Sequence, residues 1–141
     1  MSTLFRAMRE APHGLPQIGP TGRTLGVRPG LDIPAIQAYQ LVVPGEGGMS
    51  VSPHDPRNLP EHRRPPLFQG CGRDPVWRID EWQLPSSLTY RPDPRNVNHG
   101  FVEPAGSMTL QEYQDALAST QPCWVLVHTW PDQGADANAS R

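Results

Sequence analysis

The sequence predicts a single α+β domain with a mostly antiparallel, split β-sheet, few helices and long loops. Its 141 residues suit one domain and are too few for two independent cores. Several short runs alternate apolar and polar residues as strands do, and long stretches rich in the 18 prolines and 13 glycines separate them. One run has a clear helical period, and this mixture of elements is typical of the α+β class.

The first half of the chain predicts one strand followed by a long loop. Residues 3–8, TLFRAM, alternate as a short strand from which Arg6 would project. Residues 10–32 are dense in proline and glycine without a sustained period, which indicates a loop. Residues 33–43 fit either a short helix or a strand.

A second strand is expected after a glycine-rich turn, at residues 49–52. Met49 and Val51 would form its apolar face, and two serines the other. Residues 53–75 then become irregular again, and loops this long are usually functional or disordered. This loop could close over an anionic ligand or could simply be solvated; its basic side chains are His54, Arg57, His62, Arg63 and Arg64.

The second half predicts three more strands and the one clear helix. Residues 76–84 alternate as a strand, and residues 87–93 and 99–104 form two strands joined by a turn. In residues 108–120, Thr109 and Glu112 form a capping box. The buried face of this helix would carry Leu110, Tyr113 and Leu117.

The end of the chain predicts a last strand and a tail. Residues 123–130, CWVLVHTW, are strongly β-prone and are expected to be buried on both faces. Trp77, Trp82 and Trp124 are expected to be core or half-core residues. The domain would therefore span residues 1–130, with a flexible tail at 131–141.

Composition narrows the classes of function. The formal net charge of −2 supplies no general attraction to a polyanion, so nucleic acid is not expected as a partner. Cys71 and Cys123 lack metal-ligand spacing, and no metal site is expected. The sequence shows no signal peptide and no apolar run of membrane-spanning length, which predicts a cytoplasmic protein without a membrane partner.

Three polar residues occupy predicted strands at positions where an apolar residue would fit: Arg6, Ser50 and Glu103. Arginine can grip phosphate or ribose oxygens, and a carboxylate can stabilise the positive charge that develops at an anomeric carbon. Together they suit cleavage of an N-glycosidic bond in a nucleotide that contains a pyrophosphate. Each residue also has a purely structural interpretation. Arg6 could be a surface arginine or an ion-pair partner, Ser50 a common residue after a glycine turn, and Glu103 the end of a strand.

These residues lie in segments that resemble a known family. LFRAM (4–8), GGMSVS (47–52) and HGFVEPAGSM (99–108) occur in the order of the three strand motifs of the ADP-ribosyltransferase fold, in its arginine-serine-glutamate form. The sequence is most similar to small bacterial effector toxins of that fold delivered by type VI secretion. These carry a similar arginine, a Gly-Gly-x-Ser-Val segment and a His-x-x-x-x-Pro-Ala-x-x-Met stretch.

The resemblance implies an enzyme that uses NAD as a co-substrate. Nicotinamide would be lost, and ADP-ribose would pass to a macromolecular acceptor or to water. Arg6 would contact the nicotinamide ribose or a phosphate, Ser50 would buttress the nicotinamide-ribose pocket, and Glu103 would bind the ribose 2′-hydroxyl and stabilise the cation. Replacement of Glu103 by alanine is then expected to abolish turnover and leave the fold intact.

Other residues are candidates for contact with the co-substrate: Ser52, Tyr90 and His99. Tyr90 could stack on the nicotinamide ring or pack across the sheet, and His99 matches the histidine of the toxin stretch. Phe101 stands where some transferases carry a residue that selects the acceptor, so the acceptor is left open.

Two alternatives accompany the enzyme hypothesis. One is a non-enzymatic binding or immunity module of the same fold that recognises a protein through residues 53–75. The other is an RNA 2′-phosphotransferase, which also consumes NAD. An effector toxin would have a cognate immunity protein as a further partner.

Overall fold

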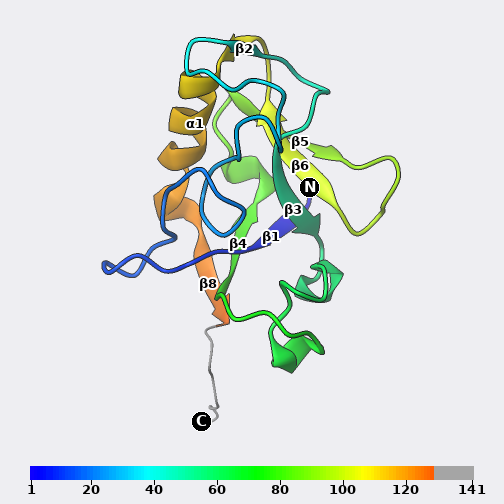
Figure 1. Cartoon of the computed structure of the whole chain (residues 1–141). Coiled ribbons are helices and arrows are strands. Elements are labelled where there is room, and N and C mark those ends of the chain that lie inside the picture. The colour runs from blue at the N-terminus through cyan, green and yellow to red at the C-terminus, as the bar shows by residue number, and fades with distance from the viewer. Residues whose placement is uncertain (129–141) are drawn as a thin grey trace.

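The computed structural model describes residues 1–128 (Figure 1). Its strands are β1 (Thr3–Ala7), β2 (Leu41–Val42), β3 (Met49–Pro53), β4 (Val76–Asp80), β5 (Leu88–Pro92), β6 (Gly100–Pro104), β7 (Met108–Thr109) and β8 (Val125–His128). Its helices are α1 (Leu110–Ser119) and the short 3-10 turns η1 (Pro56–Asn58), η2 (Pro66–Phe68), η3 (Glu81–Gln83) and η4 (Gln121–Cys123). The predicted tail, 131–141, and the end of the predicted domain, 129–130, lie outside the described residues.

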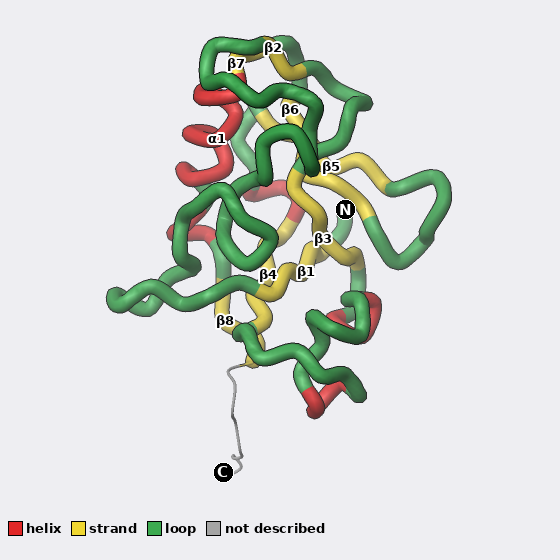
Figure 2. The backbone as a smooth tube through the Cα atoms, viewed as in Figure 1, coloured by secondary structure: helices red, strands yellow, loops and turns green. Residues whose placement is uncertain are grey.

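The strands form one large and one small sheet. The large sheet has six strands in the order β5-β6-β3-β1-β4-β8, and every neighbouring pair in it is antiparallel. β2 and β7 form the small sheet at one end of α1, and the β5–β6 hairpin extends away on the other side (Figures 1 and 2). These elements confirm the predicted α+β class with a mostly antiparallel sheet.

One face of the large sheet packs against α1 and forms the main core. Leu4, Met49 and Trp77 point to this face and are buried, as the alternation in their strands predicts. Tyr113 of α1 reaches the sheet with its hydroxyl, which accepts a hydrogen bond from the Met49 amide at 3.0 Å and donates one to the Val102 carbonyl. The helix is thereby joined to both β3 and β6.

The capping box predicted for α1 is present. The Thr109 hydroxyl accepts a hydrogen bond from the Glu112 amide at 3.1 Å, and the Glu112 carboxylate accepts one from the Thr109 amide at 2.8 Å. These bonds satisfy donors that a helix start otherwise leaves free. The predicted buried face of the helix is confirmed: Leu110, Tyr113 and Leu117.

The opposite face of the sheet carries a smaller apolar cluster. Phe5 and Val76 project from β1 and β4, and Leu59 covers them from the 53–75 loop. The loop is thus anchored to the sheet by apolar contact. Its two short 3-10 turns, η1 and η2, make it an ordered part of the described structure.

β1 and β3 separate after a short paired stretch. β1 pairs with β4 along its whole length, whereas its pairing with β3 covers Leu4 with Pro53 and Phe5 with Ser52. The two strands diverge toward Ala7 and Ser50. A cleft opens at this point, and residues of both strands line it.

Three local expectations need correction. Residues 33–43 form neither a helix nor a full strand, because most of the segment is irregular and only Leu41 and Val42 enter β2. β8 is an edge strand that pairs with β4, and Val125 is 47% exposed, so it is not buried on both faces. Trp82 is 68% exposed because β4 ends at Asp80 and the chain turns into η3.

Among the helices of residues 1–128, none has the length and apolar character that crossing a bilayer requires.

Candidate functional site

The cleft between β1 and β3 has a volume of about 200 Å³, and its lining combines apolar residues with three arginines. The 19–32 and 53–75 loops and the β5–β6 hairpin complete its walls. Its charged and hydroxyl-bearing residues are Arg6, Arg28, Asp32, Ser50, Ser52, His62, Arg63 and His99. The lining therefore contains three arginines and two histidines but one carboxylate, that of Asp32.

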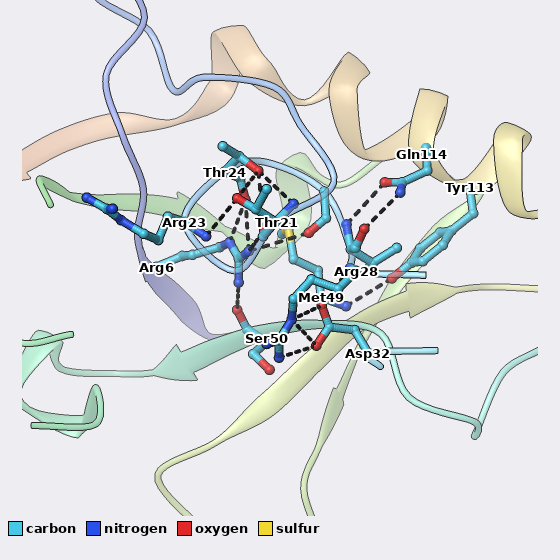
Figure 3. Close-up of polar contacts among 12 residues, drawn as sticks. Arg6, Thr21, Arg23, Thr24, Arg28, Asp32, Met49, Ser50, Tyr113 and Gln114 are labelled. Atoms are coloured by element: carbon cyan, nitrogen blue, oxygen red, sulfur yellow. Dashed lines mark hydrogen bonds and ion pairs between the residues drawn. The ribbon is translucent and has the colours of Figure 1, made fainter. Parts of the chain in front are cut away.

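Arg6 is buried and ties the 19–28 loop to the sheet (Figure 3). Its Nη2 and Nε donate to the Thr24 carbonyl at 2.8 and 3.2 Å, and its Nη1 donates to the Ser50 carbonyl at 2.8 Å. Burial, and then the charge of Arg63, lowers the pKa of Arg6 to about 10. All of these acceptors are neutral, so among residues 1–128 the positive charge of Arg6 has no hydrogen-bonded counterion.

Arg63 is the least satisfied cation of the cleft. Its closest carboxylate is that of Asp74, 4.0 Å from Nη1, and Asp74 already accepts two hydrogen bonds from Arg23 at 2.6 and 2.7 Å. Within residues 1–128, no acceptor forms a hydrogen bond with the Arg63 guanidinium, whose side chain is 25% exposed. Burial lowers the pKa of Arg63, which reflects the cost of holding this charge.

Arg28 and Asp32 neutralise each other. Nη2 of Arg28 lies 2.8 Å from Oδ1 of Asp32, and the Arg28 amide also donates to this carboxylate at 2.7 Å. The only carboxylate among the cleft's lining residues is therefore occupied. Among the described residues Arg6 is left without an ion pair, and Arg63 shares the Asp74 carboxylate with Arg23.

Hydroxyl and imidazole groups come from β3 and the β5–β6 hairpin. The register pairs Ser50 with Phe101 and Val51 with Gly100, and His99 directly precedes β6. The Ser50 hydroxyl has no hydrogen-bond partner in the part of the chain that the structure describes. The Ser52 hydroxyl donates to the main-chain carbonyl of residue 58 at 3.3 Å.

Glu103 lies outside the cleft. Its side chain is 5% exposed, and Oε1 accepts hydrogen bonds from the Gly45 amide at 2.9 Å and from Nε of Arg91 at 2.8 Å. The carboxylate thus holds the glycine-rich turn before β3 against the β5–β6 hairpin. This contact gives Glu103 a structural role.

The structure therefore separates the residues that the sequence hypothesis grouped together. Arg6, Ser50, Ser52 and His99 line the cleft. Tyr90 does not, because it lies opposite Val102 and packs against the main core.

Several residues that line the cleft were only weakly indicated as site residues by the sequence, or were not indicated at all. His62 and Arg63 belong to the basic loop that was singled out, although nothing in its pattern indicated which arginine would face inward. Arg28 and Asp32 lie in a glycine- and proline-rich loop without a period, so their pairing follows from the folded loop alone.

Comparison with known proteins found no matching family model, no similar curated protein and no similar solved structure. Any function must therefore be argued from the chemistry of the cleft.

Proposed function

We propose that the cleft binds NAD through its pyrophosphate and that the protein cleaves the nicotinamide-ribose bond. ADP-ribose would pass to a macromolecular acceptor or to water. The observation that carries the proposal is that Arg6 and Arg63 line one cleft and that, within residues 1–128, neither has a carboxylate to itself: Arg63 shares Asp74 with Arg23, and the lining carboxylate Asp32 is bound by Arg28. By its resemblance the protein would be an effector toxin with a cognate immunity protein.

Electrostatics favours a dianionic ligand at this place. Burial lowers the pKa values of both arginines, and the charge of Arg63 lowers that of Arg6 further. A bound pyrophosphate would supply negative charge to Arg6, which has no ion pair in the described residues, and to Arg63, which shares one carboxylate with Arg23. Arg63 suits this task because its planar fork can donate two parallel hydrogen bonds to phosphate oxygens. Arg6 would act mainly through its charge, because its three nitrogens already donate to main-chain carbonyls.

The rest of the lining suits a nucleotide. Ser50 offers a hydroxyl that has no hydrogen-bond partner in the described residues and can bind a ribose hydroxyl. A volume of about 200 Å³ accommodates the pyrophosphate and part of a ribose, and the remainder of the dinucleotide would extend from the open side. Glu103 has no part in this proposal, because its carboxylate is engaged by Gly45 and Arg91.

The test is calorimetric titration with NAD and with ADP, combined with chromatographic measurement of nicotinamide release. Arg63→Gln should weaken the binding of both ligands about tenfold or more, because it removes a charge-assisted contact to phosphate. Arg73→Gln is the matched control, since Arg73 is an exposed arginine of the same loop that does not line the cleft. Absence of NAD binding to the unaltered protein would contradict the proposal.

A second candidate is a non-enzymatic module that uses the same cleft to bind an anionic group of a partner. The enclosure of Glu103 favours it, because within residues 1–128 no unengaged carboxylate lines the cleft to stabilise an oxocarbenium ion. Binding of ADP and NAD with equal affinity and without nicotinamide release would support this candidate over the enzyme.

A further inference from the structure

Asp93 and His99 form a polar pair across the ends of the β5–β6 turn. Nδ1 of His99 lies 2.8 Å from Oδ2 of Asp93, and the main chain closes the same turn with a 3.0 Å hydrogen bond from the Asp93 amide to the His99 carbonyl. The Arg95 amide donates to Oδ1 of Asp93 at 2.9 Å. The carboxylate is therefore held on both of its oxygens.

This pair determines which nitrogen of His99 carries the proton. The hydrogen bond from His99, and then that from the Arg95 amide, lowers the pKa of Asp93, so the carboxylate is ionised at neutral pH. An ionised carboxylate only accepts hydrogen bonds, and Nδ1 must donate. In neutral His99, Nε2 is then the proton acceptor.

The ring is also held in place within the cleft. His99 packs edge to face against Phe101, with ring centroids 4.7 Å apart. Its side chain is 23% exposed and lines the cleft together with the unpartnered Ser50 hydroxyl. The other charged and titratable groups of that lining are Arg6, Arg28, Asp32, His62 and Arg63.

We propose that Nε2 of His99 is the proton acceptor of the cleft and that Asp93 is its positioning residue. This role rests on the proposed cleavage of NAD. As the bond between C1′ and the nicotinamide nitrogen breaks, its electron pair stays with nicotinamide, which leaves as a neutral molecule. The oxygen of water or of an acceptor hydroxyl forms the new bond to C1′, and its proton passes to Nε2 of His99.

The test compares His99→Ala with the unaltered protein in NAD binding, nicotinamide release and thermal melting. Nicotinamide release should fall about 100-fold or more. NAD affinity should fall far less, and the melting temperature should fall about as much as in Asp93→Asn, because both variants break the same hydrogen bond. Added imidazole should restore part of the lost rate. The matched control is His13→Ala, because His13 is exposed and lies outside the cleft.

Two outcomes would overturn the assignment of His99 and leave NAD cleavage standing. One is an unchanged rate of release in His99→Ala, and the other is a loss of rate that imidazole does not restore. If the unaltered protein fails to bind NAD, or binds it without release, the proposed function fails together with this role.

A measurement without NAD tests the pair directly. Long-range proton-nitrogen NMR spectra of the histidine rings should show Nε2 of His99 without a proton under mildly alkaline conditions. Asp93→Asn should disturb that tautomer, because an amide can donate to Nδ1 as well as accept from it. A protonated Nε2 in the neutral ring of the unaltered protein would overturn the assignment.

Discussion

The guanidinium of Arg6 is joined to the main-chain carbonyl of Thr24 by two hydrogen bonds, at 2.8 and 3.2 Å. A third bond reaches the Ser50 carbonyl on β3. A side chain expected to contact a ligand therefore also holds the wall of its own cleft. Structural and binding effects at this position are coupled, and a variant must be measured for both.

Arg6→Met should lower the free energy of unfolding by about 3 kcal/mol, because it leaves buried carbonyls without a donor. Removal of a buried charge offsets part of this loss, since burial already lowers the pKa of Arg6. Urea unfolding measures the change, with exposed Arg9→Met as the control. Equal stability of the two variants would contradict the structural role of Arg6.

Glu103→Ala should lower the free energy of unfolding by about 1–3 kcal/mol, because the Gly45 amide and Arg91 lose their shared acceptor. Glu103→Gln keeps a side-chain oxygen that can accept the hydrogen bond from the Gly45 amide, so it should lower the free energy of unfolding by less than Glu103→Ala. Thermal melting measures both, with Glu46→Ala, an exposed position in the same turn, as the control. Loss of nicotinamide release in Glu103→Gln at unchanged stability would instead restore the catalytic role that the family resemblance implies.

Gly22→Ala should weaken anion binding and leave stability unchanged. A Cβ at Gly22 would lie 2.8 Å from Nη2 of Arg63, and the end of this flexible side chain would be displaced from the cleft. The affinity for ADP should fall several-fold, toward that of Arg63→Gln. Gly106→Ala is the control because a Cβ there meets no atom within 4 Å. Unchanged ADP affinity in Gly22→Ala would show that Arg63 does not hold the ligand.

The hydrogen bond between Asp93 and His99 should make part of the free energy of unfolding depend on pH in the acidic range. The pKa of Asp93 lies below its ordinary value of 3.8 in the folded state, so the unfolded chain binds the proton more readily. This contribution is present above the unfolded pKa and is lost as the pH falls through the folded pKa.

Asp93→Asn should therefore reduce stability at about pH 6 and have little effect at about pH 2. Urea unfolding at both pH values measures the difference between the variant and the unaltered protein. Asp115→Asn is a suitable control, since Asp115 is an exposed carboxylate on α1. A difference that persists at the lower pH would rule out the ionised pair as its cause.

Local patterns predicted much of the fold. Alternation identified the strands at β1, β3 and β4, and the Thr109–Glu112 pair identified the start of α1, because each signal depends on neighbours within a few residues. The segment 33–43 could not be assigned, since its apolar residues fit both periods and its conformation depends on packing. Trp82 was misjudged because β4 ends before it, at Asp80, and β8 was misjudged because apolar composition does not reveal which strand lies at an edge.

The sequence by itself determined the fold class, the order of the main strands, the helix and the presence of an arginine, two serines and a histidine in strand-forming segments. Only the tertiary structure decided which of them meet. Arg6, Ser50 and His99 come from segments far apart in the chain, and the divergence of β1 from β3 brings them to one cleft. Glu103 is excluded from it because Gly45 and Arg91 engage its carboxylate. Such contacts depend on register and on the approach of loops, which no local pattern of residues encodes.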